Sequence, residues 1–200
     1  FHVTGVQTCA LPISLKENYL GNHLLIAMPA LKDANFDHTV SLICEHNEQG
    51  AMGFVLNRPT ALPIQDLLEH MEIEVTVPLD PAEVLHTGGP VQPERGFVIH
   101  TPIGDWESTL ELNSEIGITA SRDILDAIAK GQGPEKQIIT LGYAGWGEGQ
   151  LEREMTDNSW LSVPADIGLI FETEGKELWK VSANRLGIDI SLLTIEAGHA

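Results

Sequence analysis

The sequence has few basic residues, no long apolar run and only two cysteines, and each of these limits the kind of protein it can be. The 200 residues hold 11 Lys and Arg against 29 Asp and Glu, a formal net charge of −18 at pH 7. An acidic field of this size repels nucleic-acid phosphates and anionic lipids, so we expect neither direct nucleic-acid binding nor a membrane partner. No apolar run reaches the roughly 18 residues of a membrane-spanning helix. The cysteines, Cys9 and Cys44, permit at most one disulfide.

What is present is the composition of an ordinary globular protein. Hydrophobic residues make up 42% of the chain and charged residues 20%, which excludes disordered, collagen-like and coiled-coil classes. A chain of this length hides about 70% of the surface that its unfolded form exposes. No linker or internal repeat divides the sequence, so one domain is expected.

The first 13 residues differ in character from the rest. Residues 3–13 read VTGVQTCALPI, the codon-by-codon translation of a common sequencing-library adapter. They lack the basic start of a signal peptide, and Pro12 interrupts their apolar part. We interpret residues 1–13 as an adapter artefact and residues 14–200 as the native domain, which N-terminal sequencing of the natural protein would test. Cys44 is then a lone thiol, as expected in a reducing cytoplasm.

Hydrophobic periodicity predicts strands and helices mixed without regular β-α alternation. This pattern favours an α+β fold over a doubly wound sheet. We expect Ser121 to cap a helix and residues 75–83 to form a loop within the domain. The predicted strands are 23–28, 39–46, 51–57, 96–100 and 137–143, with 39–57 forming a hairpin, and the predicted helices are 64–71, 121–130, 148–155, 165–171 and 176–185.

The segment Cys44-Glu45-His46 is the first candidate site. Strict alternation on a strand places Cys44 and His46 on one face, where an imidazole could activate the thiol as a nucleophile. The alternative is a buried cysteine beside a hydrogen-bonded histidine. Val40 and Leu42 occupy the same predicted face, which favours this structural alternative.

A second candidate runs from Gly88 and Gly89 through Arg95 to His100. Adjacent glycines allow a backbone to approach a ligand closely, and an arginine can bind a carboxylate or phosphate through two hydrogen bonds. A tight turn whose arginine pairs with one of the many acids is the alternative interpretation.

A third candidate is the glycine-rich stretch at 142–150, between a predicted strand and a predicted helix. Its spacing matches neither the dinucleotide fingerprint nor the Walker pattern, so nucleotide binding is not expected. Within it, Gly145 and Trp146 could form a flat contact surface, although packing is the simpler role for the indole. The histidines show no metal-ligand spacing, so neither a metal nor another cofactor is expected.

Taken together and in this order, the motifs resemble the AlgH/YqgE family of bacterial proteins. The resemblance covers residues 14–193. The segments that carry it are NHLLIAMP at 22–29, CEH at 44–46, GAMG at 50–53, NRP at 57–59, GGPV at 88–91, RGFVIH at 95–100, LGYAGW at 141–146, GQLE at 149–152 and NSWL at 158–161.

The resemblance implies a single α+β domain, with a twisted mixed sheet forming a partial barrel and helices flanking it. It implies a cytoplasmic bacterial protein with no accepted enzymatic activity, often labelled a transcriptional regulator from a genetic link to exopolysaccharide control. The predicted helix 121–130 sets Arg122 and Lys130 against Asp123 and Asp126, a poor DNA-reading face. Any transcriptional role is therefore expected to be indirect.

We therefore expect a regulatory or binding protein that acts through another protein or a small ligand. The alternative is a thiol-dependent enzyme or redox-responsive protein centred on Cys44, with His46 as its base and Glu45 or Arg95 in support. Gly-rich turns and polar strand ends collect at sheet rims, so we expect one surface to gather the candidate residues. These are Cys44, Glu45, His46, Gly88, Gly89, Arg95, His100, Gly145 and Trp146.

Overall fold

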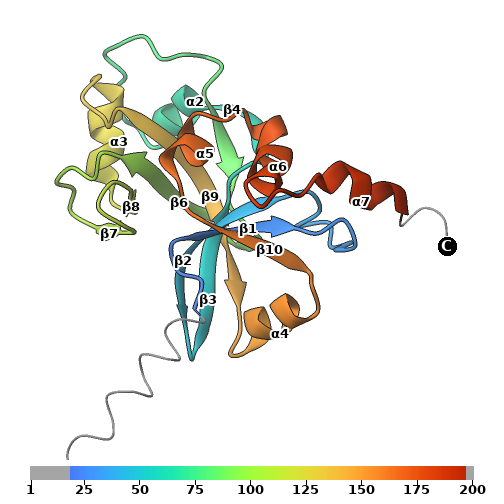
Figure 1. Ribbon diagram of the computed structural model, residues 1–200. Coiled ribbons are helices and arrows are strands. Elements are labelled where there is room, and N and C mark those ends of the chain that lie inside the picture. Colours follow the sequence, from blue (N-terminus) through green and yellow to red (C-terminus); the bar gives the residue numbers. More distant parts are fainter. Residues whose placement is uncertain (1–18, 197–200) are drawn as a thin grey trace, which may run out of the picture.

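The computed structural model describes residues 19–196, and side chains as far as residue 193. The interpretation of residues 1–13 as an adapter artefact, and Cys9 with it, lies outside the described residues. Within them, strands form one ten-stranded sheet that curls into a half-barrel, with helices on its outside (Figure 1). The predicted α+β class and partial barrel are therefore confirmed.

The strands follow the order β10-β1-β2-β3-β9-β6-β8-β7, with β5 also beside β9 and β4 beside β5. All of these pairs are antiparallel except β5 with β9, which is parallel. The strands are β1 (His23–Ala27), β2 (Val40–Asn47), β3 (Gly50–Val55), β4 (Pro59–Pro63), β5 (Val84–Thr87), β6 (Val91–Thr101), β7 (Thr109–Glu111), β8 (Gly117–Thr119), β9 (Lys136–Trp146) and β10 (Trp160–Pro164).

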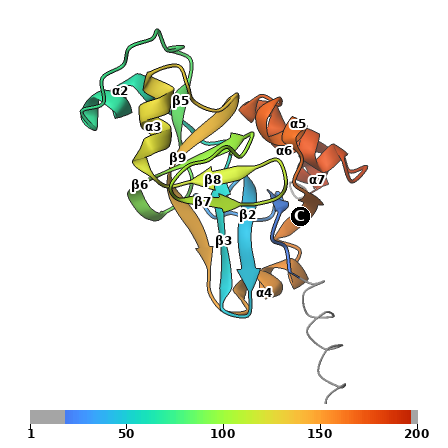
Figure 2. The ribbon, with the colours of Figure 1, turned by 90° about the vertical axis from the view of Figure 1, so that its left-hand side faces the viewer.

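The helices divide the hydrophobic interior into three clusters. Helices α2 and α3 lie on one side of the sheet and α5 and α6 on the other, as both views show (Figures 1 and 2). We call these clusters the α2–α3 core and the α5–α6 core; a third, the α4 core, lies under α4. The helices are α2 (Ile64–His70), α3 (Arg122–Ala129), α4 (Gln150–Thr156), α5 (Ile167–Phe171), α6 (Gly175–Asn184) and α7 (Ile190–Glu196).

Every predicted helix and strand has an observed counterpart, and residues 75–83 form a loop as expected. The short strands β4, β5, β7, β8 and β10 were not predicted. Ser121 is the N-cap residue of α3 as predicted, but its hydroxyl accepts the backbone N–H of Ser108 and donates to Asp123, and it accepts no helix N–H. A nearby carboxylate is the stronger acceptor for that hydroxyl.

Candidate functional site

Cys44 is partly buried, in surroundings that do not activate its thiol as a nucleophile. It packs against the α5–α6 core, and its Sγ lies 3.8 Å from the carbonyl oxygen of Leu42. Burial, with the charge of Glu45 as a second cause, raises the pKa of the thiol far above its ordinary value. The structure thus supplies a thiol that stays protonated, the opposite of an activated one.

The expectation that Cys44 and His46 share a face is wrong, and a β-bulge is the reason. The register of β2 against β3 shifts between Ile43 and Glu45, which leaves Cys44 as the extra residue. A bulge resets the alternation of side chains. His46 therefore lies on the α4 side, directly across from Ala51, while Cys44 faces the α5–α6 core.

Both ring nitrogens of His46 are already engaged. Nδ1 accepts the backbone N–H of Leu20 at 2.9 Å, so Nε2 carries the proton of the neutral ring and donates it to Glu152 Oε1 at 2.5 Å. The Tyr19 ring lies against the imidazole, 4.9 Å between centroids. This histidine holds α4 and the segment before β1 against the sheet and is not free to act as a base for Cys44.

Trp146 joins His46 on this side of the sheet. Ala51 pairs with His46 on one side and with Trp146 on the other, so the three form a row across β2, β3 and β9. The indole N–H of Trp146 donates to Glu154 Oε2 at 2.8 Å. Carboxylates of α4 therefore hold both residues, and packing is the role that this geometry gives the indole.

The partial burial and raised pKa of Cys44 predict slow chemical modification of its thiol. With Cys9 replaced by serine, we expect iodoacetamide to label the folded protein about 100-fold more slowly than the urea-unfolded chain, because alkylation needs an exposed thiolate. Labelling rates followed by mass spectrometry from pH 7 to 9 provide the measurement. Rates within tenfold of those of the unfolded chain would restore Cys44 as a reactive group.

Gly88 and Gly89 serve close packing of the backbone. A Cβ on Gly88 would lie 2.4 Å from the carbonyl oxygen of Gly142, and one on Gly89 would lie 2.2 Å from the backbone of Tyr143. Gly145 has no such neighbour, its nearest contact being 3.8 Å away. Because neither glycine has a side chain, the connection between β5 and β6 can pass across β9 in direct backbone contact.

Arg95 and His100 lie apart from these residues and from each other. The Arg95 guanidinium sits over the Phe97 ring, 5.0 Å from its centroid. His100 is fully buried: its Nδ1 donates to the carbonyl of Pro102 at 3.0 Å, and its Nε2 accepts from Thr119 Oγ1 at 2.7 Å. Burial lowers the pKa of His100, so it is a neutral structural histidine at pH 7.

The nine predicted residues therefore do not form one surface. The structure brings together His46 and Trp146, and it separates them from Cys44, Arg95 and His100. A different group of residues lines a hollow in the protein surface.

We call this hollow the His86 cleft. It consists of two adjoining cavities of about 540 Å³ and 400 Å³ between β5, β9 and the start of α6. Both are within the size range of small-molecule sites. The residues that line both are Glu83, His86, Gln137, Ile138 and Gly175.

His86 lines both cavities of the cleft and has a buried polar atom without a hydrogen-bond partner. Its Nδ1 is buried without a hydrogen-bond partner, and so is Oγ1 of Thr140, the residue paired with it across β5 and β9. Burial lowers the pKa of His86, which the backbone carbonyl of Val84 only partly offsets. The cleft is thus lined by a neutral imidazole whose buried Nδ1 has no hydrogen-bond partner.

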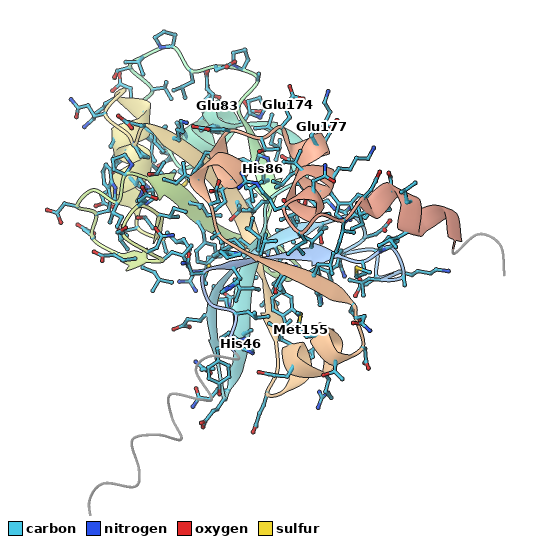
Figure 3. All side chains as sticks on the ribbon, viewed as in Figure 1. His46, Glu83, His86, Met155, Glu174 and Glu177 are labelled. Atoms are coloured by element: carbon cyan, nitrogen blue, oxygen red, sulfur yellow. The ribbon has the colours of Figure 1, made fainter. Side chains whose placement is uncertain are left out.

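The charges around the cleft are mostly negative. Two lysines line it, but Lys136 is paired with Glu172 at 2.7 Å and Lys176 lies 3.3 Å from Glu174. No ion pair engages Glu83 or Glu135 within residues 19–193. Glu83, Glu174 and Glu177 gather at the same end of the molecule as His86 (Figure 3).

A resident metal ion does not fit these residues. No group of three or more His, Cys, Asp and Glu in the described chain is arranged to hold one. The helices between residues 19 and 196 also include none that is long and apolar enough to cross a bilayer.

The sequence offers no pattern that singles out His86. Its neighbours in the cleft come from β5, β9, the loop before β5 and the start of α6, and only the folded chain brings them together. A half-buried histidine on an unpredicted four-residue strand has no periodicity to distinguish it. The sequence feature nearest to His86 is the Gly88-Gly89 pair, which begins two residues after it.

Comparison with known proteins gives one family throughout. The model of the AlgH-like family, DUF179, matches residues 24–191. A UPF0301 protein of Nitrosococcus oceani is 51% identical over 183 residues, covering 91% of this chain and 97% of its own. A UPF0301 protein of Pseudomonas aeruginosa is 49% identical, covering 91% and 96%.

Two solved structures match the fold. The solution structure of AlgH from Pseudomonas aeruginosa superposes with a TM-score of 0.74 at 49% identity, covering 92% of this chain and 97% of that one. A Corynebacterium diphtheriae protein superposes with a TM-score of 0.68 at 21% identity, covering 88% and 91%, a likeness of fold alone. The chain belongs to the AlgH-like family.

Proposed function

We propose that this protein is a binding protein with a regulatory role, and that the His86 cleft takes a small organic cation, an amine with a short apolar body. The observation that carries the proposal is the neutral imidazole of His86, which lines a cavity of ligand size and has a buried Nδ1 without a hydrogen-bond partner. A binding site built to hold a polar ligand leaves such a group unsatisfied when it is empty.

The walls of the cleft match both parts of such a ligand. Ile138, Val84 and Leu178 supply apolar surface for its hydrocarbon portion. An ammonium group donates hydrogen bonds, which an imidazole lone pair and the carboxylate of Glu83 can accept. The acidic residues at the start of α6 also offset the positive end of that helix, which disfavours an anion there.

The net charge of −18 also favours a positively charged ligand, because it raises the local concentration of cations and opposes contact with DNA. We place the protein in the cytoplasm on the strength of its single expected thiol. Any effect on transcription would then pass through the ligand or a protein partner. The partly buried thiol of Cys44, with its raised pKa, gives the thiol-enzyme alternative no support.

Replacing His86 with leucine is expected to change stability and binding in opposite directions. Removing a buried polar group without a partner should stabilise the unliganded protein by about 1 kcal/mol. The same change should weaken n-butylammonium binding at least tenfold, since the acceptor is gone. Urea unfolding measures the first effect and isothermal titration calorimetry the second.

Matched variants and ligands separate this proposal from a general attraction of cations. Butyrate, which has the same chain length and the opposite charge, should not bind the wild-type cleft. Glu83→Gln should weaken n-butylammonium binding about threefold, as befits an exposed carboxylate, while Glu94→Gln on another surface should leave it unchanged. Equal effects of these two variants, or equal binding of butyrate, would rule out the proposed site.

A further inference from the structure

A second, separate pocket of about 340 Å³ opens between α2, α3 and the strands β6 and β9. Its walls are the partly exposed side chains of the α2–α3 core, among them Leu67, Met71, Leu125 and Leu141. It shares only Ile139 with the His86 cleft. This pocket presents a more apolar interior than the cleft and can enclose a hydrocarbon chain.

The charge at this pocket is opposite to that of the chain as a whole. Arg95 and Arg122 line it, two of the five arginines of the sequence, against one carboxylate from Glu94. Arg95 forms no ion pair within the described residues and only contacts the Phe97 ring. A site of this kind is notable in a chain of net charge −18, which repels anions elsewhere.

Apart from the exposed His70, the polar side chains beside the arginines are already hydrogen-bonded. Thr119 Oγ1 is bonded to His100 and to Thr109, and Ser121 Oγ donates to Asp123. Arg122 uses one nitrogen for the carbonyl of Met71 at 3.0 Å. Its Nε also lies 3.8 Å from Asp126 Oδ1, so Arg95, whose guanidinium forms no ion pair in the described part of the chain, is the main donor left for a ligand and Arg122 is the second.

We infer that this pocket binds an amphiphilic anion, a carboxylate with an unbranched hydrocarbon tail, whose head meets the arginines and whose tail lies against the α2–α3 core. The inference is independent of the proposed function of the His86 cleft, because the ligands have opposite charge and the sites have different walls. An arginine–carboxylate contact adds affinity and orientation that the apolar walls alone do not give.

Three eight-carbon probes with different heads test the inference: octanoate, octanol and octylammonium. Because an alkylammonium could also occupy the His86 cleft, affinity for this pocket is taken from the NMR titration of methyl groups in its walls, where we expect octanoate to bind at least tenfold more tightly than the other two. Methyl resonances of Leu67, Leu125 and Leu141 should shift on titration with octanoate. Equal affinities for all three probes, or shifts confined to other parts of the molecule, would overturn the inference.

Arginine variants provide a second test of the inference. Arg95→Met and Arg122→Met should each weaken octanoate binding about tenfold and leave octanol binding unchanged, since each removes one charge-assisted contact. Arg153→Met, on α4, is the matched control and should have no effect. Arg122→Met also loses the bond to Met71, so Arg95→Met, which loses no hydrogen bond, keeps the test valid if that variant folds poorly. Unchanged octanoate affinity in Arg95→Met would overturn the role of that arginine and with it the inference.

Discussion

Replacing Gly89 with alanine should lower the free energy of unfolding by about 3 kcal/mol or more, the largest effect that we expect from a single methyl group in this protein. The new Cβ would lie 2.2 Å from both the carbonyl carbon and the oxygen of Tyr143, and a backbone carbonyl cannot rotate away as a side chain can. Gly89 also has φ +154°, a conformation that L side chains rarely adopt.

The clash would also disturb the neighbouring strands, because the adjacent Gly88 is hydrogen-bonded to two of them. The preceding Gly88 donates to Leu141 and accepts from Val55, each at 2.8 Å, so it links β9 to the end of β3. A displacement of the crossing would disturb both bonds. Urea unfolding should show a lower midpoint with an unchanged slope.

Gly145→Ala is the control for this prediction. Gly145 lies in the same β9 strand and its nearest neighbour would be 3.8 Å from a new Cβ. Its φ is not positive, so the substitution should change stability by less than about 1 kcal/mol, in the stabilising direction expected for alanine over glycine in a strand. Equal stability losses in the two variants would contradict the role assigned to the crossing.

Glu154→Ala should destabilise the protein by about 2–4 kcal/mol, because one carboxylate serves two buried indoles. Glu154 Oε2 accepts from Trp146 Nε1 at 2.8 Å and from Trp160 Nε1 at 3.1 Å, and Oε1 accepts from Gln150 at 3.2 Å. Both indoles are at most 5% exposed, so water cannot replace the lost acceptor without a rearrangement. Thermal and urea unfolding measure the loss.

Two further substitutions separate the loss of the acceptor oxygens from the loss of the negative charge. Glu154→Gln keeps one oxygen that can accept from both indoles, so it should cost about 1–2 kcal/mol, less than alanine does. Glu148→Gln removes the same charge from an exposed loop position and should change stability by less than about 0.5 kcal/mol. A Glu154→Ala loss no greater than that of Glu148→Gln would refute the role of the carboxylate.

The sequence predicts those parts of the fold that depend on local pattern. The hairpin of β2 and β3 was foreseen because its strands are adjacent and alternate, and α3 because Ile124 and Ile128 mark one buried stripe. The pairing of β1 with β10 could not be foreseen, since it joins segments from opposite ends of the domain. Short strands such as β7 and β8 are too brief to show a period.

The site was harder to predict than the fold. A single bulged residue, Cys44, moves His46 to the other face of β2, and alternation read from sequence carries no sign of it. Nothing in the sequence indicates that Glu152 and Glu154 are the acceptors for His46 and Trp146. Which acid pairs with which donor depends on the position of α4 over the sheet, a tertiary property.

The position of β1 in the sheet has a consequence for synthesis on the ribosome. β1 is among the first strands to emerge, and β2 soon covers one of its edges, but the other edge pairs with β10 (Trp160–Pro164) near the end of translation. Until then Leu24, Leu25 and Ile26, fully buried in the finished protein, border an unpaired edge. Nascent chains that stall before Trp160 should therefore be prone to edge-to-edge aggregation and dependent on chaperones.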